Sequence, residues 1–185
     1  MIIGIVGSIA SGKDTVADYL KTKGFAALSL SDTLRKLMRQ DGAEITTSNM
    51  TEYGNNLRNT KGYDYLAKEA SKEIKSNEDV IVTSIRQVGE VEYFKQMANF
   101  TLVKLDAPIE LRLDRLIKRG REGDIKNLTE LQEIEAKQAD GKGGGMNMNR
   151  CYQLADEEII NDGTFDELYQ KVDDLVLNLR SKDQL

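Results

Sequence analysis

Short apolar runs alternate along the chain with stretches whose apolar residues recur at helical spacing. The runs at 2–6, 25–30, 79–85, 100–105 and 157–161 are rich in aliphatic residues, as is typical of buried strands. Helices are expected at 14–22, from 31, at 51–58, 63–76 and 88–98, from 109, at 129–138 and 146–155, and from 164. This alternation predicts an α/β fold in three layers, with a five-stranded parallel sheet and helices on both faces.

The first apolar run leads directly into the pattern Gly7-x-x-x-x-Gly12-Lys13, which is a P-loop. Its glycines allow backbone N–H groups to turn towards a phosphate chain, and Lys13 adds a positive charge. The prediction is a P-loop NTPase fold whose ATP-binding residues include Gly7, Ser8, Ile9, Ala10, Ser11, Gly12, Lys13, Asp14 and Thr15. The alternative is a glycine-rich turn with an exposed lysine, which the combination of strand, loop and helix disfavours.

One position departs from the usual P-loop. Asp14 stands where a Ser or Thr hydroxyl normally contacts Mg²⁺, and Thr15 follows it. A carboxylate beside phosphates is tolerable only with a metal ion between them, because the two negative charges otherwise repel. Asp14 is therefore predicted to bind Mg²⁺ directly or through water, with Thr15 as the alternative ligand.

Three arginines suggest a second, acceptor-binding half of the site. Arg35, Arg58 and Arg86 follow the second strand, a polar segment and the third strand. Two of them should emerge at the carboxyl edge of the sheet, where parallel sheets bind ligands. Because guanidinium groups suit a dianionic phosphate, we expect a phosphorylated acceptor. The predicted organisation is a single domain, 1–185, with an acceptor-binding insert at about 31–61.

The helix after Pro108 carries Arg112, Arg115 and Arg119 on one side. A row of charges is usually a solvated face, but spacings of three and four residues favour a wall that faces an anion. The glycine-rich stretch at about 120–145 predicts a small lid, with a surface excursion of no function as the alternative. Cationic residues available to the lid are chiefly Arg121, Lys126, Lys142 and Arg150.

Composition narrows the chemistry. The 185 residues carry a formal net charge of −5, no histidine and a single cysteine, Cys151. The acidic balance argues against nucleic acid and anionic membranes as partners, and the lack of histidine removes His-based catalysis and His-ligated metals. No apolar run approaches membrane-spanning length and the P-loop begins at residue 7, so a cytoplasmic protein without a signal peptide is expected. Cys151 is expected to be a buried hydrophobe.

The order of these segments resembles the P-loop small-molecule kinases, specifically the nucleoside and deoxynucleoside monophosphate kinases, with dephospho-CoA kinase as a near relative. Residues 31–35 and 82–86 are similar to the family segments that grip the acceptor phosphate, and Glu90 falls in a pattern of phage-type deoxynucleotide kinases. The resemblance implies that Arg115 lies against the donor base and Arg119 touches the donor phosphates. It also implies that the turn holding Asn161 and Gly163 cradles adenine.

One departure from that family is the absence of an acidic residue at the end of the third strand, where this chain has Thr83 and Ser84. Asp14 is expected to supply the missing charge from the other side.

The expected reaction is transfer of the ATP γ-phosphoryl group to a nucleoside monophosphate, with Lys13, Mg²⁺, Arg86 and Arg119 stabilising the transferring charge. Two alternatives stay open. Transfer to a hydroxyl, as in dephospho-CoA kinase, would make Asp32 a candidate base on the acceptor side. A P-loop ATPase or nucleotide-gated interaction module would need no acceptor arginines.

Overall fold

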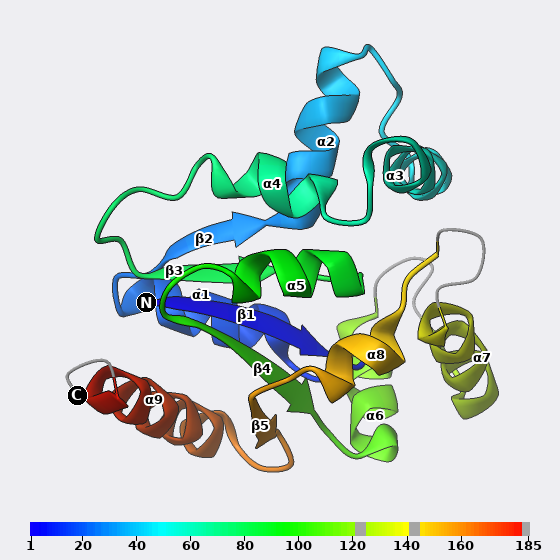
Figure 1. The fold of residues 1–185 in the computed structure, drawn as a ribbon. Coiled ribbons are helices and arrows are strands. Elements are labelled where there is room, and N and C mark those ends of the chain that lie inside the picture. Colours follow the sequence, from blue (N-terminus) through cyan, green and yellow to red (C-terminus); the bar gives the residue numbers. More distant parts are fainter. Residues whose placement is uncertain (121–124, 141–144, 183–185) are drawn as a thin grey trace.

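The computed structural model describes residues 1–120, 125–140 and 145–182. Its strands are β1 (Ile2–Gly7), β2 (Ala26–Ser29), β3 (Val80–Thr83), β4 (Phe100–Asp106) and β5 (Glu157–Ile160). All pairings are parallel in the order β2-β3-β1-β4-β5, which places β1 at the centre (Figure 1). The predicted five-stranded parallel sheet is confirmed.

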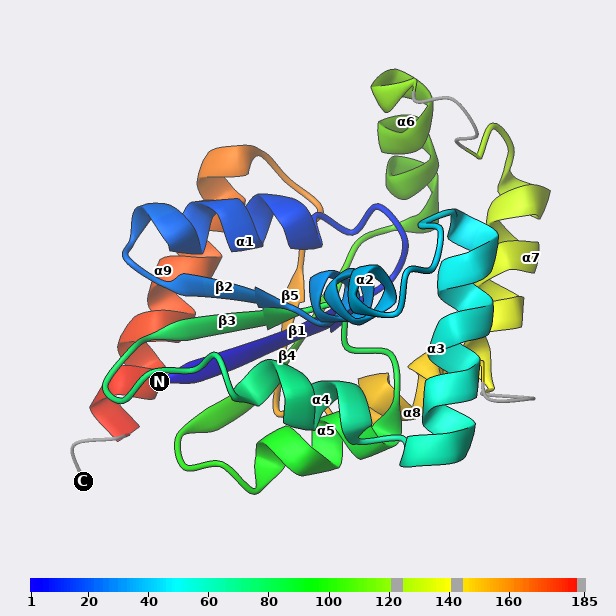
Figure 2. The ribbon, with the colours of Figure 1, turned by 90° about the horizontal axis from the view of Figure 1, so that it is seen from above.

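The helices of the described residues follow the predicted alternation. They are α1 (Lys13–Thr22), α2 (Leu30–Gln40), α3 (Thr47–Lys61), α4 (Tyr65–Ser71), α5 (Val88–Lys95), α6 (Ile109–Arg119), α7 (Leu128–Ala139), α8 (Met148–Gln153) and α9 (Phe165–Lys182). Figure 2 shows α1 and α4 on opposite sides of the sheet.

Alternation along β1 explains the two cores of the molecule. Ile3 and Ile5 pack with apolar residues of α1 and α9 on one face. Ile2 and Val6 pack on the other face with residues of α4, α5 and α8, including the buried thiol of Cys151. A strand buried on both faces is held rigidly, so the loop that follows β1 starts from a fixed position.

Two helix starts differ from the sequence prediction. α2 begins directly after β2, because the Ser29 hydroxyl accepts the Asp32 N–H at 3.3 Å and caps the helix; Ser31 and Asp32 are not the cap. α7 begins earlier than Thr129, because the side chain of Asn127 accepts the Glu130 N–H at 2.9 Å. In both cases a polar side chain two residues earlier provides the cap.

α3 is much longer than the short helix expected at 51–58. Its polar composition gives little intrinsic helix propensity, but Thr46 caps it by accepting the Asn49 N–H at 3.1 Å. Its apolar residues Met50, Tyr53 and Leu57 pack against a small cluster of Leu34, Met38 and Leu66. Tertiary packing therefore determines the length of this helix. α4 and α8, in contrast, are shorter than expected.

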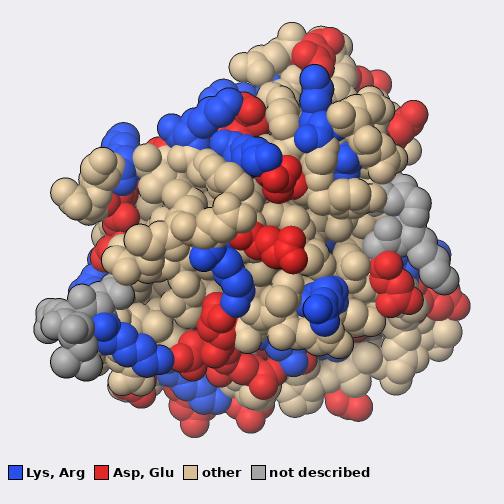
Figure 3. Space-filling model, in the orientation of Figure 1, with Lys and Arg blue, Asp and Glu red and all other residues tan. Residues whose placement is uncertain are grey.

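The surface carries both signs of charge. Figure 3 shows Lys and Arg interspersed with Asp and Glu over the face drawn there. None of the helices in the described part of the chain has the length and apolar character needed to span a bilayer.

Candidate functional site

The P-loop lies at the carboxyl end of the central strand, between β1 and α1. Gly12 adopts φ 103° and Ala10 adopts φ 59°, so the loop turns tightly through the left-handed region. A Cβ on Gly7 would lie 2.0 Å from the Leu105 carbonyl oxygen, which means that only glycine allows the loop to lie this close to β4. The loop is thus shaped by strand β4 as well as by its own sequence.

Lys13 closes the loop from within. Its Nζ donates hydrogen bonds to the carbonyl oxygens of Gly7 at 2.9 Å and Ser8 at 2.6 Å. Burial lowers the pKa of Lys13 to about 8, and nearby Asp14 acts in the opposite direction. The charges of Arg86 and Arg112 lower it further. Because this ammonium group is partly desolvated, the phosphates of a bound nucleotide would stabilise its positive charge.

A pocket of about 630 Å³ opens beside the P-loop. Its walls come from the start of α1, from α6, and from the turn between β5 and α9. Lining residues predicted to bind ATP are Ala10, Gly12, Lys13, Asp14, Thr15, Arg115, Arg119, Asn161 and Gly163. Phe165 adds an exposed aromatic ring to the lining, and the sequence analysis did not predict this residue to be part of the site.

Asn161 joins the two sides of this pocket. Its buried side-chain amide donates to the Ser11 carbonyl oxygen at 2.8 Å, and its own carbonyl groups accept from Arg115 at 3.0 and 3.2 Å. The arrangement holds the α6 arginine, the P-loop and the β5–α9 turn in one network. Asn161 therefore supports the pocket wall, and the contact of this turn with adenine stays a prediction.

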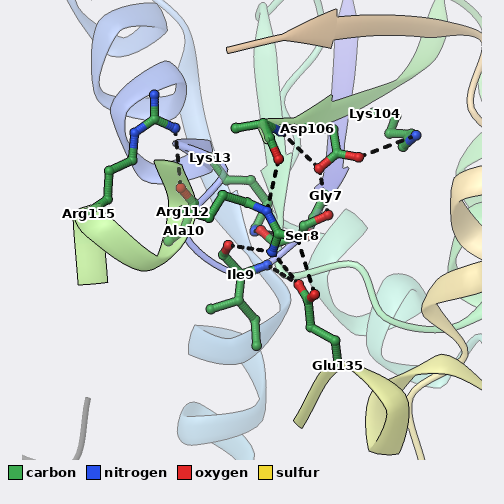
Figure 4. A network of polar contacts seen from close by, with 11 residues as sticks. Gly7, Ser8, Ile9, Ala10, Lys13, Lys104, Asp106, Arg112, Arg115 and Glu135 are labelled. Atoms are coloured by element: carbon green, nitrogen blue, oxygen red, sulfur yellow. Dashed lines mark hydrogen bonds and ion pairs between the residues drawn. The ribbon is translucent and has the colours of Figure 1, made fainter. Parts of the chain in front are cut away.

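Arg112 corrects the expectation of an arginine wall on α6. Its guanidinium group is 6% exposed and points inward, where it donates to the carbonyl oxygens of Ala107 at 3.0 Å and Ile9 at 3.1 Å. Glu135 of α7 pairs with it at 2.5 Å (Figure 4). Arg115 and Arg119 line the pocket, whereas Arg112, in the first turn of α6, is held inward by its bonds to Ala107, Ile9 and Glu135.

Asp106 ends β4 next to the P-loop, on the opposite side of β1 from Thr83. Its carboxylate accepts the Ser8 hydroxyl at 2.7 Å and the Ala107 N–H at 2.9 Å (Figure 4). The sequence contained a usable signal, since an acidic residue at the carboxyl end of a parallel strand lies at the ligand-binding edge. For Glu135, which contacts the P-loop from α7, no sequence pattern pointed to this role.

Of the three arginines predicted to bind an acceptor, Arg58 and Arg86 both contact Glu90, and the charge of Arg35 acts on Arg86. Arg86 is partly buried, and burial lowers its pKa; the charges of Glu90, Arg58 and Arg35 also act on it. Arg58 is buried, with a guanidinium nitrogen 4.0 Å from the Glu90 carboxylate, and its Nε is one of two buried side-chain polar atoms without a hydrogen-bond partner among the described residues.

Glu90 lies at the centre of this cluster, 1% exposed. One of its oxygens accepts the N–H groups of Arg86 at 2.8 Å and Gln87 at 3.1 Å. Burial raises the pKa of Glu90 to about 6, against the opposing effect of Arg58. The carboxylate thus fixes the backbone that presents Arg86.

Arg35 and Asp32 sit on the first turns of α2 and are exposed to different degrees. Their side chains form an ion pair at 2.7 Å, and the Asp32 side chain is 73% exposed. The predicted lid residues Arg121 and Lys142 lie outside the described residues, and Arg150 bonds the side chain of Gln153 at 2.9 Å.

The oxygen groups at the start of α1 suit a hard divalent cation. Asp14 is exposed on the first turn and lines the pocket together with Thr15. Among the described residues, no group of three or more His, Cys, Asp or Glu side chains is arranged to hold a metal ion. One carboxylate with phosphate oxygens and water is the usual coordination of Mg²⁺ at nucleotide sites, so the residues present fit Mg²⁺ delivered with the nucleotide.

Comparison with known proteins bears on this geometry. The AAA domain family matches residues 3–139. A UPF0200 protein from Methanothrix thermoacetophila is 33% identical over 172 residues, covering 92% of this chain and 93% of that protein. Another from Sulfurisphaera tokodaii is 30% identical over 175 residues, covering 95% of each chain.

Among solved structures, shikimate kinase from Acinetobacter baumannii in complex with shikimate has a TM-score of 0.56 at 20% identity, covering 96% of this chain and 93% of that one. At that identity the likeness shows the fold alone, which is that of a P-loop kinase. This likeness does not distinguish nucleoside monophosphate kinases from other P-loop kinases. The 33% identity extends over nearly the full length of both chains, and the AAA domain family matches residues 3–139. This chain therefore belongs to the UPF0200 family and carries an AAA domain with a P-loop kinase-like fold.

Proposed function

We propose that this protein is an ATP- and Mg²⁺-dependent phosphotransferase whose acceptor is a small phosphorylated molecule, most specifically a nucleoside or deoxynucleoside monophosphate. In the reaction an acceptor phosphate oxygen forms a bond to the γ-phosphorus of ATP. The bond from that phosphorus to the bridging oxygen breaks, and ADP leaves. An acceptor phosphate is already ionised at neutral pH, so no strong general base is required.

The observation that carries this proposal is the buried cluster in which the Glu90 carboxylate lies 4.0 Å from the Arg58 guanidinium and accepts the Arg86 N–H at 2.8 Å, with Arg86 near enough to act on the charge of Lys13. The positive charges of Arg58 and Arg35 act electrostatically on Arg86, and the charge of Arg86 acts on Lys13. Asp32 and Glu90 offset part of the repulsion among these cations, and a bound phosphate would offset more of it. The P-loop supplies a site for one set of phosphates, and these arginines supply a site for another.

The donor side follows from the pocket. The N–H groups of the P-loop and the start of α1 would hold the ATP phosphates, and Lys13 would leave its carbonyl partners to meet them. Arg115, held by Asn161, would face the base, and Arg119 would face the phosphates. Arg86 and Arg119 would then stabilise charge on the transferring group from opposite sides.

Asp14 and Thr15 are the residues that would hold Mg²⁺. The chemistry that a bound Mg²⁺ supplies is neutralisation of the phosphate charge and restraint of its geometry. If Asp14 is a ligand, Asp14→Ser should change the Mg²⁺ concentration needed for ATP binding, measured by calorimetry, by several-fold. Asp18→Ser is the matched control, because Asp18 lies on the same helix and is exposed. Superimposable Mg²⁺ titrations of the Asp14 variant and wild type would show that the assignment is wrong.

A second candidate acceptor is a hydroxyl group. The observation in its favour is that Asp32 is exposed on the acceptor side, next to Arg35. Its carboxylate is held in an ion pair with Arg35 at 2.7 Å and would have to leave that partner to accept a proton from a hydroxyl group, which favours the phosphate acceptor. A nucleotide-hydrolysing or nucleotide-gated module is the remaining possibility, for which the acceptor arginines would have no purpose.

The test is an ADP-release assay with ATP, Mg²⁺ and a panel of ribo- and deoxynucleoside monophosphates plus dephospho-CoA. We expect ADP release to depend on one or a few of the monophosphates. Activity on dephospho-CoA alone would favour the hydroxyl acceptor, and release that no acceptor changes would favour hydrolysis.

The acceptor site is tested by Arg86→Ala. Loss of one charge-assisted contact should raise the KM for the acceptor by about tenfold or more, with a smaller effect on the KM for ATP. Arg39→Ala is the control, since Arg39 is an exposed arginine at the far end of α2. Equal losses for both substrates would count against the role of Arg86.

A further inference from the structure

Phe165 brings an exposed aromatic ring to the donor pocket. It is 67% exposed and is the one aromatic residue among the described residues that line this pocket. It begins α9, directly after the turn that holds Gly163 and Thr164. Single exposed apolar side chains are common on protein surfaces, so exposure alone assigns no role to this ring. Its packing and its neighbours in the pocket carry the argument.

The Phe165 ring ends a row of three aromatic rings. Its centroid lies 6.2 Å from that of Tyr169, and Tyr169 in turn stacks on Tyr19 at 4.1 Å with 10° between the ring planes. The Tyr19 hydroxyl donates to Asp173 of α9 at 2.7 Å, which fixes the other end of the row. Because these contacts restrict the orientations of the Phe165 side chain, the ring is partly ordered before any ligand binds.

The Arg115 guanidinium group uses its edge for contacts inside the protein. It donates to the backbone and side-chain oxygens of Asn161 at 3.0 and 3.2 Å, and to the Ala10 carbonyl oxygen at 3.4 Å (Figure 4). Because the N–H groups of a guanidinium lie in its plane, these bonds fix that plane and do not use its faces. Arg115 therefore offers a flat face to a planar ligand in the pocket that it lines.

The polar side chains beside these two residues are engaged within the protein. The Thr164 N–H and hydroxyl both donate to the Glu167 carboxylate, at 2.7 and 3.0 Å, and the Asn161 amide bonds the P-loop. Asp114 and Lys118, which also line the pocket, pair with each other at 2.7 Å. Adenine and guanine differ in the hydrogen-bonding groups on their edges, which these engaged side chains are poorly placed to read.

We propose that Phe165 and Arg115 hold the donor base by stacking on its faces, so that this pocket accepts adenine and guanine nucleotides alike. Stacking tolerates different bases because every base has a π-face, whereas strong discrimination requires hydrogen bonds to the base edge. The inference rests on the proposed function only in placing the donor nucleotide in this pocket. It adds that the donor is a purine nucleoside triphosphate, with little preference between ATP and GTP.

Calorimetry with the Mg²⁺ complexes of ADP, GDP and pyrophosphate measures the contribution of the base. The dissociation constants of ADP and GDP should agree within about tenfold. Phe165→Ala should weaken both nucleotides by about tenfold, the size expected for one stacking contact, and should change the affinity for pyrophosphate, which has no base, by less than about twofold. Leu177→Ala is the matched control, since Leu177 is an exposed apolar residue of the same helix.

Fluorescence gives a second measurement, because the chain contains no tryptophan. Phe165→Trp places a single indole in the pocket and retains an aromatic face for the base. Its fluorescence should change on addition of either nucleotide and stay constant on addition of pyrophosphate. In Leu177→Trp the indole lies about 18 Å further along α9, so neither nucleotide should change its fluorescence.

Three results would overturn the proposal. A preference of more than about tenfold for one purine would mean that the pocket reads the base edge. Equal weakening of ADP and pyrophosphate by Phe165→Ala would mean that the ring only supports the fold of the pocket. Fluorescence of the Phe165→Trp variant that saturating nucleotide leaves unchanged would place the base elsewhere. Because only binding without an acceptor is measured, failure to find a phosphorylated acceptor would count against the proposed function and leave this inference standing.

Discussion

At the scale of single residues, the most consequential ionisable group is the Lys13 ammonium. It is bound by two carbonyl oxygens and has lost much of its hydration, which lowers its pKa to about 8. A phosphate chain would reverse the shift, because a nearby negative charge favours the protonated lysine. Nucleotide binding and protonation of Lys13 are therefore linked.

This linkage predicts a pH dependence of ATP affinity. The affinity should be constant below pH 8 and fall above it, since the free protein then carries neutral Lys13 and must take up a proton to bind. Calorimetry at pH 8.5 in buffers of different ionisation enthalpy should detect that uptake. Lys13→Arg, which stays charged, should lose the proton uptake. An affinity that is flat from pH 7.5 to 9.5 in wild type would contradict the role of Lys13.

Glu90 offers a test of the acceptor cluster through stability. Its pKa is raised from 4.5 to about 6 by burial, so the folded state binds a proton more readily than the unfolded state does. Glu90 therefore contributes stability below about pH 4.5 that is lost as the pH rises through about 6.

The comparison is with Glu90→Gln, which keeps an acceptor for the N–H groups of Arg86 and Gln87. Relative to this variant, wild type should gain about 1 kcal/mol of unfolding free energy between pH 7.5 and pH 5. Urea denaturation at the two pH values measures the difference. A shift in the opposite direction would mean that the pairing with Arg58 outweighs the cost of burial.

At the scale of elements, the junction between the P-loop and α1 depends on Gly12. Its φ of 103° is unfavourable for other residues, and a Cβ there would lie 2.5 Å from the Asn161 amide nitrogen. That amide bonds Ser11 and also belongs to the group that holds Arg115. A substitution at Gly12 would therefore disturb the start of α1 and the pocket wall together.

Gly24, just beyond the end of α1, provides the control. It has φ 93°, but nothing lies within 4 Å of a Cβ built on it. Gly24→Ala should cost about 1 kcal/mol from backbone strain alone, and Gly12→Ala about 1–2 kcal/mol more because of the displaced amide. Chemical denaturation of both variants measures the costs. Equal costs would show that the Asn161 side chain moves aside without any loss in the free energy of unfolding.

The helices also differ in what determines them. α9 carries a regular apolar stripe, and the capping box that the sequence predicts at its start forms between Thr164 and Glu167. α3 is mostly polar and carries a shorter apolar stripe, Met50, Tyr53 and Leu57, which packs against α2 and α4. Where a helix is polar, its limits depend on its partners, which a local pattern does not reveal.

At the scale of the whole molecule, the fold was predictable because it is determined by repeated local signals. Five apolar runs, each followed by a helical pattern, led to the parallel sheet that the structure contains. The P-loop was predictable for the same reason, since strand, glycines and lysine are adjacent in the chain. The positions of Arg35 and Arg86 followed from the rule that ligands bind at the carboxyl edge of such sheets, whereas Arg58 lies on α3, away from the strand ends.

The contacts that complete the site were not predictable in this way. Arg112 and Arg115 are three residues apart on α6, yet one is buried against Glu135 and the other lines the pocket. Spacing alone placed them together with Arg119 in one row. Glu135 reaches Ile9 from 126 residues away in the chain, through the packing of α7. Contacts of this range depend on tertiary structure, so neither the orientation of Arg112 nor the role of Glu135 had a local signal.

The central claim is that the P-loop and the three arginines form the two halves of a phosphoryl-transfer site. It is tested most directly by ³¹P NMR of the protein with ATP, Mg²⁺ and each nucleoside monophosphate of the panel, because the spectrum separates nucleoside monophosphate, nucleoside diphosphate and inorganic phosphate and so shows whether the acceptor or water receives the phosphoryl group. The account predicts the signals of ADP together with those of a second nucleoside diphosphate. ADP with inorganic phosphate in every sample, whichever acceptor is present, would contradict it.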